Sequence, residues 1–115
     1  MHRKLEVYKK SMDLACLVYE LLRELPRTEE YALGSQIRRA AVSIPSNIAE
    51  GFGRSSLRDR LRFMHIARGS LLELETQLEL VTRLNYIKLP PTEEILLVKK
   101  LLAGLIRSIE GRMVN

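Results

Sequence analysis

The stretch SLRDRLRFMHIARGSLLELETQLELVTRL, residues 56–84, has the pattern of one long amphipathic helix. Its apolar residues recur every three or four positions, which matches the 3.6-residue turn of an α-helix. They are Leu57, Leu61, Met64, Ala67, Leu71, Leu74, Leu78 and Val81. At about 1.5 Å per residue, the helix is about 42 Å long. Ser56, followed by Asp59 three residues later, predicts an N-cap and a capping box at its start.

A second helix is expected before this segment, from Thr28 to Phe52. Thr28 followed by two glutamates is typical of a helix start, because a hydroxyl caps free amides and acidic groups favour the positive end of the helix dipole. Pro45 removes one backbone hydrogen bond, so a kink is expected there. An apolar stripe continues in phase across the proline, which favours one kinked helix over two. The stripe is Leu33, Ile37, Ala40, Ile44 and Ile48, and Gly51 and Gly53 end the helix.

Two further amphipathic helices flank this pair. The first covers residues 7–25 and ends before Pro26, and the fourth starts at Thr92 and is expected to fray near Gly111. The main stripe of the first is Tyr8, Met12, Ala15, Tyr19 and Leu22, widened by Val7, Leu14, Val18, Leu21 and Leu25. The stripe of the fourth is Ile95, Val98, Leu102, Leu105 and Ile109. Four such helices with short loops predict an all-α single domain, residues 1–115, folded as an antiparallel up-and-down four-helix bundle.

The composition agrees with a helical core and a cytoplasmic location. Hydrophobic residues make up 46% of the chain but aromatic residues only 5%, so the core is expected to contain mainly Leu, Ile, Val, Ala and Met. No apolar run approaches the roughly 18 to 20 residues that span a bilayer, and no secretion signal is recognisable. We therefore expect no membrane contact. The single cysteine, Cys16, lies in an apolar helical stretch and is expected to be buried and unreactive.

The sequence lacks the residue patterns of known catalytic and metal sites. A carboxylate-bridged metal pair in a four-helix bundle needs Glu-x-x-His on two helices, and the only histidines are His2 and His65. Walker loops, nucleophile elbows, dinucleotide fingerprints and zinc-ligand spacings are also missing. We therefore expect no enzyme, no catalytic residues, no metal and no cofactor.

The net charge of +5 is concentrated in the middle of the chain. Residues 35–70 contain seven arginines and two acidic residues, and the remaining residues contain twelve basic and twelve acidic ones. One interpretation is a nucleic-acid surface in which arginine forks bind backbone phosphates. Its candidate residues are Arg38, Arg39, Arg54, Arg58, Arg62 and Arg68. The alternative is structural: these arginines pair with carboxylates, as Glu50 and Arg54 could at one-turn spacing, or with another subunit.

Three smaller features lie in the same region. Residues 39–49 loosely resemble a helix-turn-helix, although the glycine of the usual turn is missing. Gly69 and Ser70 lie in the interior of the third predicted helix, where glycine is unfavourable. Their presence suggests that neighbouring helices approach closely there. Asn47 borders the core stripe and is expected to fix the helix register or a subunit contact.

The outer face of the second helix carries little charge for a surface that faces only water. It consists of Ser35, Arg39, Val42, Ser46, Ala49 and Glu50. Small and apolar side chains in this position predict that another helix packs against it, most simply from a second copy of the protein. Val42, Ser46 and Ala49 are therefore the candidate oligomer interface. The alternative is a tolerant surface with small residues.

Several long runs resemble one bacterial protein family. They are QIRRAAVSIPSNIAEGFGR (residues 36–54), IARGSLLELETQL (66–78), VYKKSMDLA (7–15) and Arg62-Phe63. The family consists of four-helix-bundle proteins encoded in intervening sequences of 23S ribosomal RNA genes. The resemblance implies an up-and-down bundle that is similar to members assembling as homopentameric rings, and a ribosomal or RNA-binding role inferred from the gene location. It supplies no catalytic residues.

Two functions are carried forward from the sequence. The first is a non-enzymatic, oligomeric helical bundle that binds RNA, ribosomal or ribosome-associated, through the arginine-rich surface of the second and third helices. The second is a structural or adaptor oligomer with a protein partner, such as an accessory protein of a retroelement reverse transcriptase. A related group that resembles this family has that accessory role. An enzyme with no recognisable motif is the remaining class.

Overall fold

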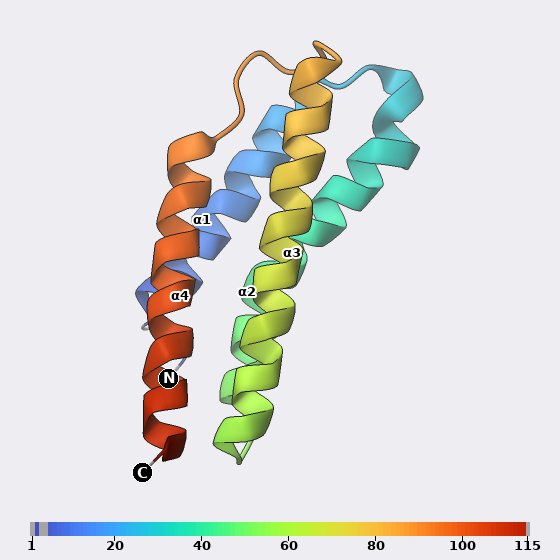
Figure 1. Cartoon of the computed structure of the whole chain (residues 1–115). Coiled ribbons are helices and arrows are strands. Elements are labelled where there is room, and N and C mark those ends of the chain that lie inside the picture. Colours follow the sequence, from blue (N-terminus) through green and yellow to red (C-terminus); the bar gives the residue numbers. More distant parts are fainter. Residues whose placement is uncertain (1, 3–4, 115) are drawn as a thin grey trace.

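The chain forms four long helices that run alternately up and down (Figure 1). The computed structural model describes residues 2 and 5–114. The helices are α1 (Glu6–Leu21), α2 (Ser35–Phe52), α3 (Leu57–Arg83) and α4 (Thr92–Val114). Each helix packs against two others: α1 and α3 both contact α2 and α4. The bundle measures 51 × 23 × 21 Å, and its described residues form no strand. The predicted four-helix bundle is confirmed.

The core is built from the stripes that the sequence predicts on α2, α3 and α4. Ile37, Ile44 and Ile48 of α2 are fully buried, as are Leu71 and Leu74 of α3. The other buried positions of these helices include Ala40, Met64, Ala67, Leu78, Val81, Ile95, Val98, Leu102, Ile106 and Ile109. Burying a side chain of this kind contributes about 1.5 to 3 kcal/mol, so these rows hold the bundle together.

The start of α3 is fixed by a side-chain cap. The Ser56 hydroxyl oxygen accepts a hydrogen bond of 3.1 Å from the Asp59 backbone N–H, which confirms the predicted N-cap. The Asp59 carboxylate does not complete a capping box, because it pairs with Arg54 and Arg62.

Removal of this cap is expected to destabilise the protein slightly. Ser56→Ala leaves an amide of the first turn without its hydroxyl acceptor, and such a loss costs typically about 1 kcal/mol. Urea unfolding followed by circular dichroism measures the change. Ser55→Ala is the matched control, since Ser55 is exposed and precedes the cap. An equal effect in both variants would contradict the capping role of Ser56.

The connection between α1 and α2 differs from the predicted helix start at Thr28. A 3-10 turn at Leu22–Glu24 follows α1, a second covers Arg27–Glu29, and a π-helical turn covers Glu30–Gly34 before α2 begins. Thr28 lies inside the second 3-10 turn. Neither this turn nor the π-helical turn has a side-chain cap. Arg38 of α2 reaches back instead: its Nη2 donates to the Glu30 carbonyl oxygen at 3.1 Å and pairs with the Glu30 carboxylate at 2.8 Å. This contact holds the wide turn against α2.

The second helix runs through Pro45 without interruption. Residues 39–49 are therefore one continuous helix, and the helix-turn-helix alternative is wrong. The kink expected at Pro45 stays a prediction. At the other end of the chain, α4 continues through Gly111 to Val114, so the predicted fraying near Gly111 is also wrong.

The close approach of α2 and α3 occurs at Gly51 and not at the predicted Gly69. A Cβ atom added to Gly51 would lie 2.5 Å from Met64 Cε and 2.9 Å from Phe63 Cβ, whereas one added to Gly69 would meet nothing within 4 Å. Ser70, the neighbour of Gly69, does contact α2, since its hydroxyl lies 2.8 Å from that of Ser43. The two helices thus approach most closely beside the turn that joins them.

A short polar seam continues this contact between α2 and α3. The Asn47 amide donates to the Ser43 carbonyl oxygen at 2.8 Å and lies 2.9 Å from the Ser43 hydroxyl. Ser43 in turn contacts Ser70, so Asn47 orients the hydroxyl that bridges the helices. This arrangement agrees with the register role expected for Asn47.

Candidate functional site

Arginines gather at the turn between α2 and α3. Arg54 pairs with Glu50 at 2.8 Å and lies 3.7 Å from the Asp59 carboxylate. Arg62 pairs with the same Asp59 carboxylate at 2.9 Å. The predicted one-turn pair of Glu50 and Arg54 therefore forms, and Asp59 links two of the candidate arginines. We call Glu50, Arg54, Asp59, Arg62 and Phe63 the turn cluster.

Three arginines of this region stack on phenylalanine rings. The Phe63 ring centroid lies 4.7 Å from Arg54 Cζ and 4.5 Å from Arg62 Cζ. Arg60 Cζ lies 4.4 Å from the centroid of the second ring, that of Phe52. Cation–π contacts of this kind fix the orientation of planar guanidinium groups. Arg60 was not among the sequence candidates, because its contact with Phe52 crosses the turn and leaves no periodic signal.

Arg38 lies apart from the turn cluster. Arg38 pairs with Glu30 of the π-helical turn, and its Cζ lies 5.9 Å from the centroid of the Tyr19 ring of α1. It lies in the first turn of α2, fourteen residues before the last residue of the helix, Phe52, which corresponds to about 21 Å. Arg38 therefore has a structural role at the far end of α2, and its assignment to a nucleic-acid surface is not supported by its position.

Four arginines of α2 and α3 remain without a carboxylate partner among residues 2 and 5–114. They are Arg39, Arg58, Arg60 and Arg68. Arg39 lines a shallow polar cavity with Ser43, Ser70 and Glu73, and Arg68 contacts His65 Nδ1 at 2.9 Å. Arg39, Arg58 and Arg68 are exposed. We call Arg39, Arg54, Arg58, Arg62 and Arg68 the arginine surface.

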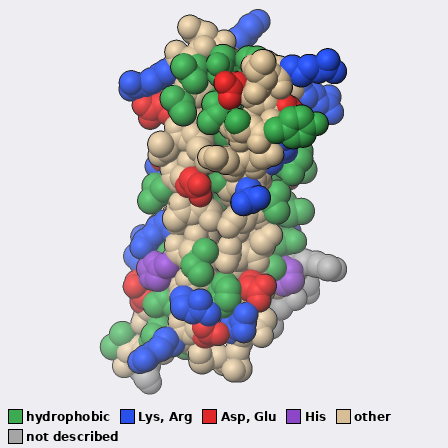
Figure 2. Space-filling model, turned by 90° about the vertical axis from the view of Figure 1, so that its right-hand side faces the viewer, with side chains coloured by type: hydrophobic (Ala, Val, Ile, Leu, Met, Phe, Trp, Pro, Cys, Tyr) green, Lys and Arg blue, Asp and Glu red, His purple; other side chains and the backbone are tan. Residues whose placement is uncertain are grey.

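The charge on this part of the molecule is mixed. Figure 2 shows basic and acidic side chains interleaved at the end of the bundle where α2 meets α3. Arg54 and Arg62 stay 42% and 58% exposed although both are paired. The arginines of the described residues therefore divide into two groups: some form ion pairs at the turn, and others are exposed without a carboxylate partner.

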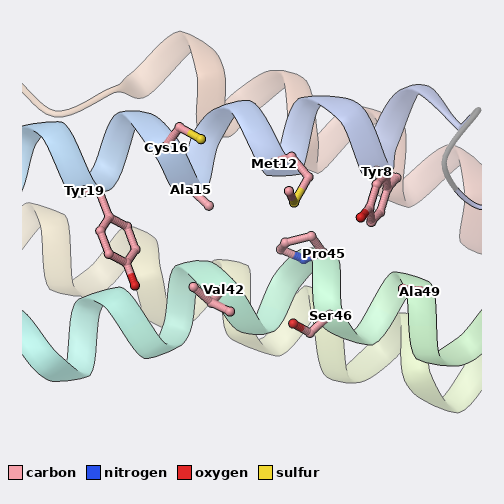
Figure 3. A pocket seen from close by; sticks show the side chains of 9 residues that line it. All are labelled: Tyr8, Met12, Ala15, Cys16, Tyr19, Val42, Pro45, Ser46 and Ala49. Atoms are coloured by element: carbon pink, nitrogen blue, oxygen red, sulfur yellow. The ribbon is translucent and has the colours of Figure 1, made fainter.

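A second feature is an open apolar groove between α1 and α2 (Figure 3). It has a volume of about 680 Å³. Its lining residues come from both helices and are Tyr8, Met12, Ala15, Cys16, Tyr19, Val42, Pro45, Ser46 and Ala49. Met12 and Pro45 lie on facing sides of it in Figure 3. The three candidate interface residues, Val42, Ser46 and Ala49, thus all line what we call the α1–α2 groove.

The groove corrects two expectations for α1. Met12 and Tyr19, predicted to be core residues, are 43% and 49% exposed, and Cys16, predicted to be buried, is exposed. The core side of α1 consists of Val7, Leu14 and Val18 together with Ala15 and the buried Ser11, and Leu22 of the following 3-10 turn continues it. The apolar arc of α1 is wider than the bundle can cover, so half of it lines the groove. Overlapping stripes in the sequence could have signalled this excess.

Among residues 2 and 5–114, no group of three or more His, Cys, Asp or Glu side chains is arranged to hold a metal ion. In the same part of the chain, no helix is both long enough and apolar enough to cross a bilayer.

These features define a small up-and-down helical bundle with an arginine-rich turn and an exposed apolar groove. The family model described as 23S rRNA-intervening sequence protein matches residues 3–109. The chain belongs to this family, as the sequence resemblance suggested. It is also similar to a crystal structure, at 1.70 Å resolution, of a protein of unknown function from the S23 ribosomal protein family of Bacteroides thetaiotaomicron VPI-5482. The two share 25% identity over 95% of this chain and 99% of that one, with a TM-score of 0.67. The curated proteins yielded no match.

Proposed function

We propose that this protein is a non-enzymatic, homo-oligomeric bundle that binds RNA through the arginine surface. The observation that carries the proposal is the position of the net charge: residues 35–70 hold all of it, and Arg39, Arg58 and Arg68 are exposed there without carboxylate partners among the described residues. Guanidinium forks match the geometry of phosphate oxygens. The name of the family and the ribosomal-protein family of the structural relative favour RNA as the anion.

Affinity of this kind arises mainly from counterion release. Each arginine that neutralises a phosphate frees a condensed cation, so the logarithm of the binding constant falls linearly with the logarithm of the salt concentration. The slope reports the number of phosphates contacted. Arginines that are already paired, such as Arg54 and Arg62, contribute less because they must share their charge with Asp59.

The salt slope should fall when free arginines are removed. Arg39→Gln/Arg58→Gln removes two exposed cations that have no carboxylate partner in the described part of the chain, so the fold is expected to be unaffected. We expect weaker binding of a labelled ribosomal RNA fragment and a slope reduced by about 2, because each lost phosphate contact removes about 1. Fluorescence anisotropy at several salt concentrations measures both quantities.

Arg23→Gln/Arg27→Gln is the matched control, because it removes the same charge outside the arginine surface, in the connection between α1 and α2. Arg23 forms only an exposed pair with Glu20, which contributes little to stability. An equal loss of affinity in both double variants would indicate a non-specific charge effect. Failure of the wild type to bind RNA at low salt would refute the proposed RNA-binding function and favour an adaptor that recognises a protein.

The α1–α2 groove supports the oligomeric part of the proposal. Met12, Tyr19 and Val42 expose apolar surface along one continuous cavity, and another helix could cover it. Apolar residues stand exposed elsewhere on the chain, including Leu72 of α3 and Leu96 of α4. A contact between two different surfaces of identical chains closes into a ring when the rotation allows it. We propose a second copy as the occupant, and the pentamer implied by the sequence resemblance as the assembly.

A charge placed in the groove should dissociate the oligomer. We expect Val42→Glu to reduce the mass in light scattering toward 13.3 kDa, that of one chain, because a buried unpaired carboxylate is costly. Cys16 lies in the same groove, so its reaction with a maleimide should accelerate in this variant. Leu89→Glu, at an exposed position outside the groove, is the control. A wild-type mass of one chain would exclude this assembly.

A further inference from the structure

Both phenylalanines of this protein contact arginines beside the turn between α2 and α3. The chain contains two phenylalanines, four tyrosines and no tryptophan. Arg60 lies over the Phe52 ring, and Arg54 and Arg62 lie over the ring of the buried Phe63. A ring face covered by a guanidinium group is not available to stack on a base.

The tyrosines lie elsewhere. Tyr8 and Tyr19 line the α1–α2 groove, and Tyr86 is partly buried with its hydroxyl 3.5 Å from a Glu29 carboxylate oxygen. Tyr31 is 90% exposed but belongs to the π-helical turn at the opposite end of α2 from the turn cluster. Proteins that bind single strands usually stack successive bases on aromatic side chains, and the rings beside the turn cluster already contact guanidinium groups.

The free arginines are instead spread along the outside of two helices. Arg39 lines the same shallow cavity as Glu73, and Glu73 follows Arg58 by fifteen residues on α3. The two arginines are therefore separated by about 22 Å along the bundle axis. A duplex presents its phosphates in a fixed array that can reach such distant groups at once. A single strand would have to give up conformational freedom to do the same.

We propose that the RNA recognised by this protein is double-stranded and that it is held through its phosphates, independently of base sequence. This inference rests on the proposed RNA-binding function and specifies its substrate. Double-stranded RNA hides its base edges in a deep, narrow groove, so proteins recognise it by shape and by contacts with phosphates and 2′-hydroxyls. A surface of arginines without stacking platforms has the chemistry for this mode.

The test compares three labelled probes with the wild-type protein at fixed salt. They are a 20-base-pair RNA duplex, a duplex of scrambled sequence with the same composition, and an unstructured single-stranded RNA of the same length. We expect both duplexes to bind with affinities within about twofold of each other, since phosphate contacts carry no sequence information. We expect the single strand to bind about tenfold more weakly or worse, since the stacking that would hold it is missing.

Two variants sharpen the result. Arg39→Gln/Arg58→Gln should weaken duplex binding, whereas Tyr31→Ala should leave it unchanged, because binding through phosphates alone does not use this exposed aromatic ring. Equal or tighter binding of the single strand, or loss of binding in Tyr31→Ala, would overturn the duplex inference while RNA binding itself stands. Binding of none of the three probes at low salt would refute the proposed function as well.

Discussion

Gly51→Ala is expected to lower the free energy of unfolding by about 2 to 3 kcal/mol, because it forces an atom into a closely packed helix contact. The new Cβ would lie 2.9 Å from Phe63 Cβ and 3.2 Å from the Arg60 carbonyl oxygen. Both atoms are fixed by the α3 backbone and cannot rotate away. The third neighbour, Met64 Cε, is the end of a flexible side chain, but that side chain is fully buried. Relief therefore requires α2 and α3 to separate near their turn.

Gly69→Ala is the matched control, since it is the same substitution in a helix with nothing within 4 Å of the new atom. It is expected to stabilise the protein by about 0.5 to 1 kcal/mol, because alanine loses less conformational freedom than glycine in a helix. Urea unfolding of the three proteins measures both changes. If Gly51→Ala were as stable as Gly69→Ala, the close approach at Gly51 could not be a constraint on the bundle.

Leu74→Ala is expected to cost about 3 to 5 kcal/mol, the largest loss from a single core truncation. Leu74 is fully buried at the centre of the α3 stripe, among side chains that have little room to collapse into the cavity. A domain of this size has a total stability of about 6 to 17 kcal/mol, so the variant loses a substantial fraction of it. Chemical unfolding at a fixed protein concentration measures the loss.

Leu72→Ala provides the comparison two residues away on the same helix. Leu72 is 50% exposed, so its truncation should change the unfolding free energy by less than about 1 kcal/mol. If Leu72 covers the groove of another copy in the oligomer, its truncation lowers the mass in light scattering instead. Equal destabilisation by the two leucine truncations would contradict the placement of the core.

Periodicity predicted most of this fold because the physical causes are local. The α3 stripe and the Ser56 cap depend on residues within one or two turns of each other, and both are confirmed. The start of α2 at Thr28 was wrong because a more distant contact prevails there. Arg38 binds Glu30 from one full turn inside α2 and favours a π-helical turn over a capped α-helix. Helix-capping rules consider only residues close to the helix end, so they do not detect the contact between Arg38 and Glu30.

The site was predicted less completely, for a related reason. The Glu50–Arg54 pair follows from one-turn spacing and forms as expected. The arginine–phenylalanine contacts join α2 to α3 across the turn, so only the packed structure reveals them. One wall of the α1–α2 groove consists of Val42, Ser46 and Ala49, which were predicted as an apolar outer face of α2, while the other wall was assigned to the core. A periodic stripe reports that a helix face is apolar but not which neighbour covers it.

The order in which the helices pack has consequences for how the chain acquires its structure. Three of the four helix contacts join consecutive helices, and the turn between α2 and α3 spans only residues 53–56. Folding dominated by such local contacts is fast, with relaxation expected in the microsecond to millisecond range. Only the contact of α1 with α4 joins distant parts of the chain. During synthesis the part of α1 that packs against α4 must therefore stay uncovered until α4 has left the ribosome, and this interval is when the nascent chain is most exposed to aggregation.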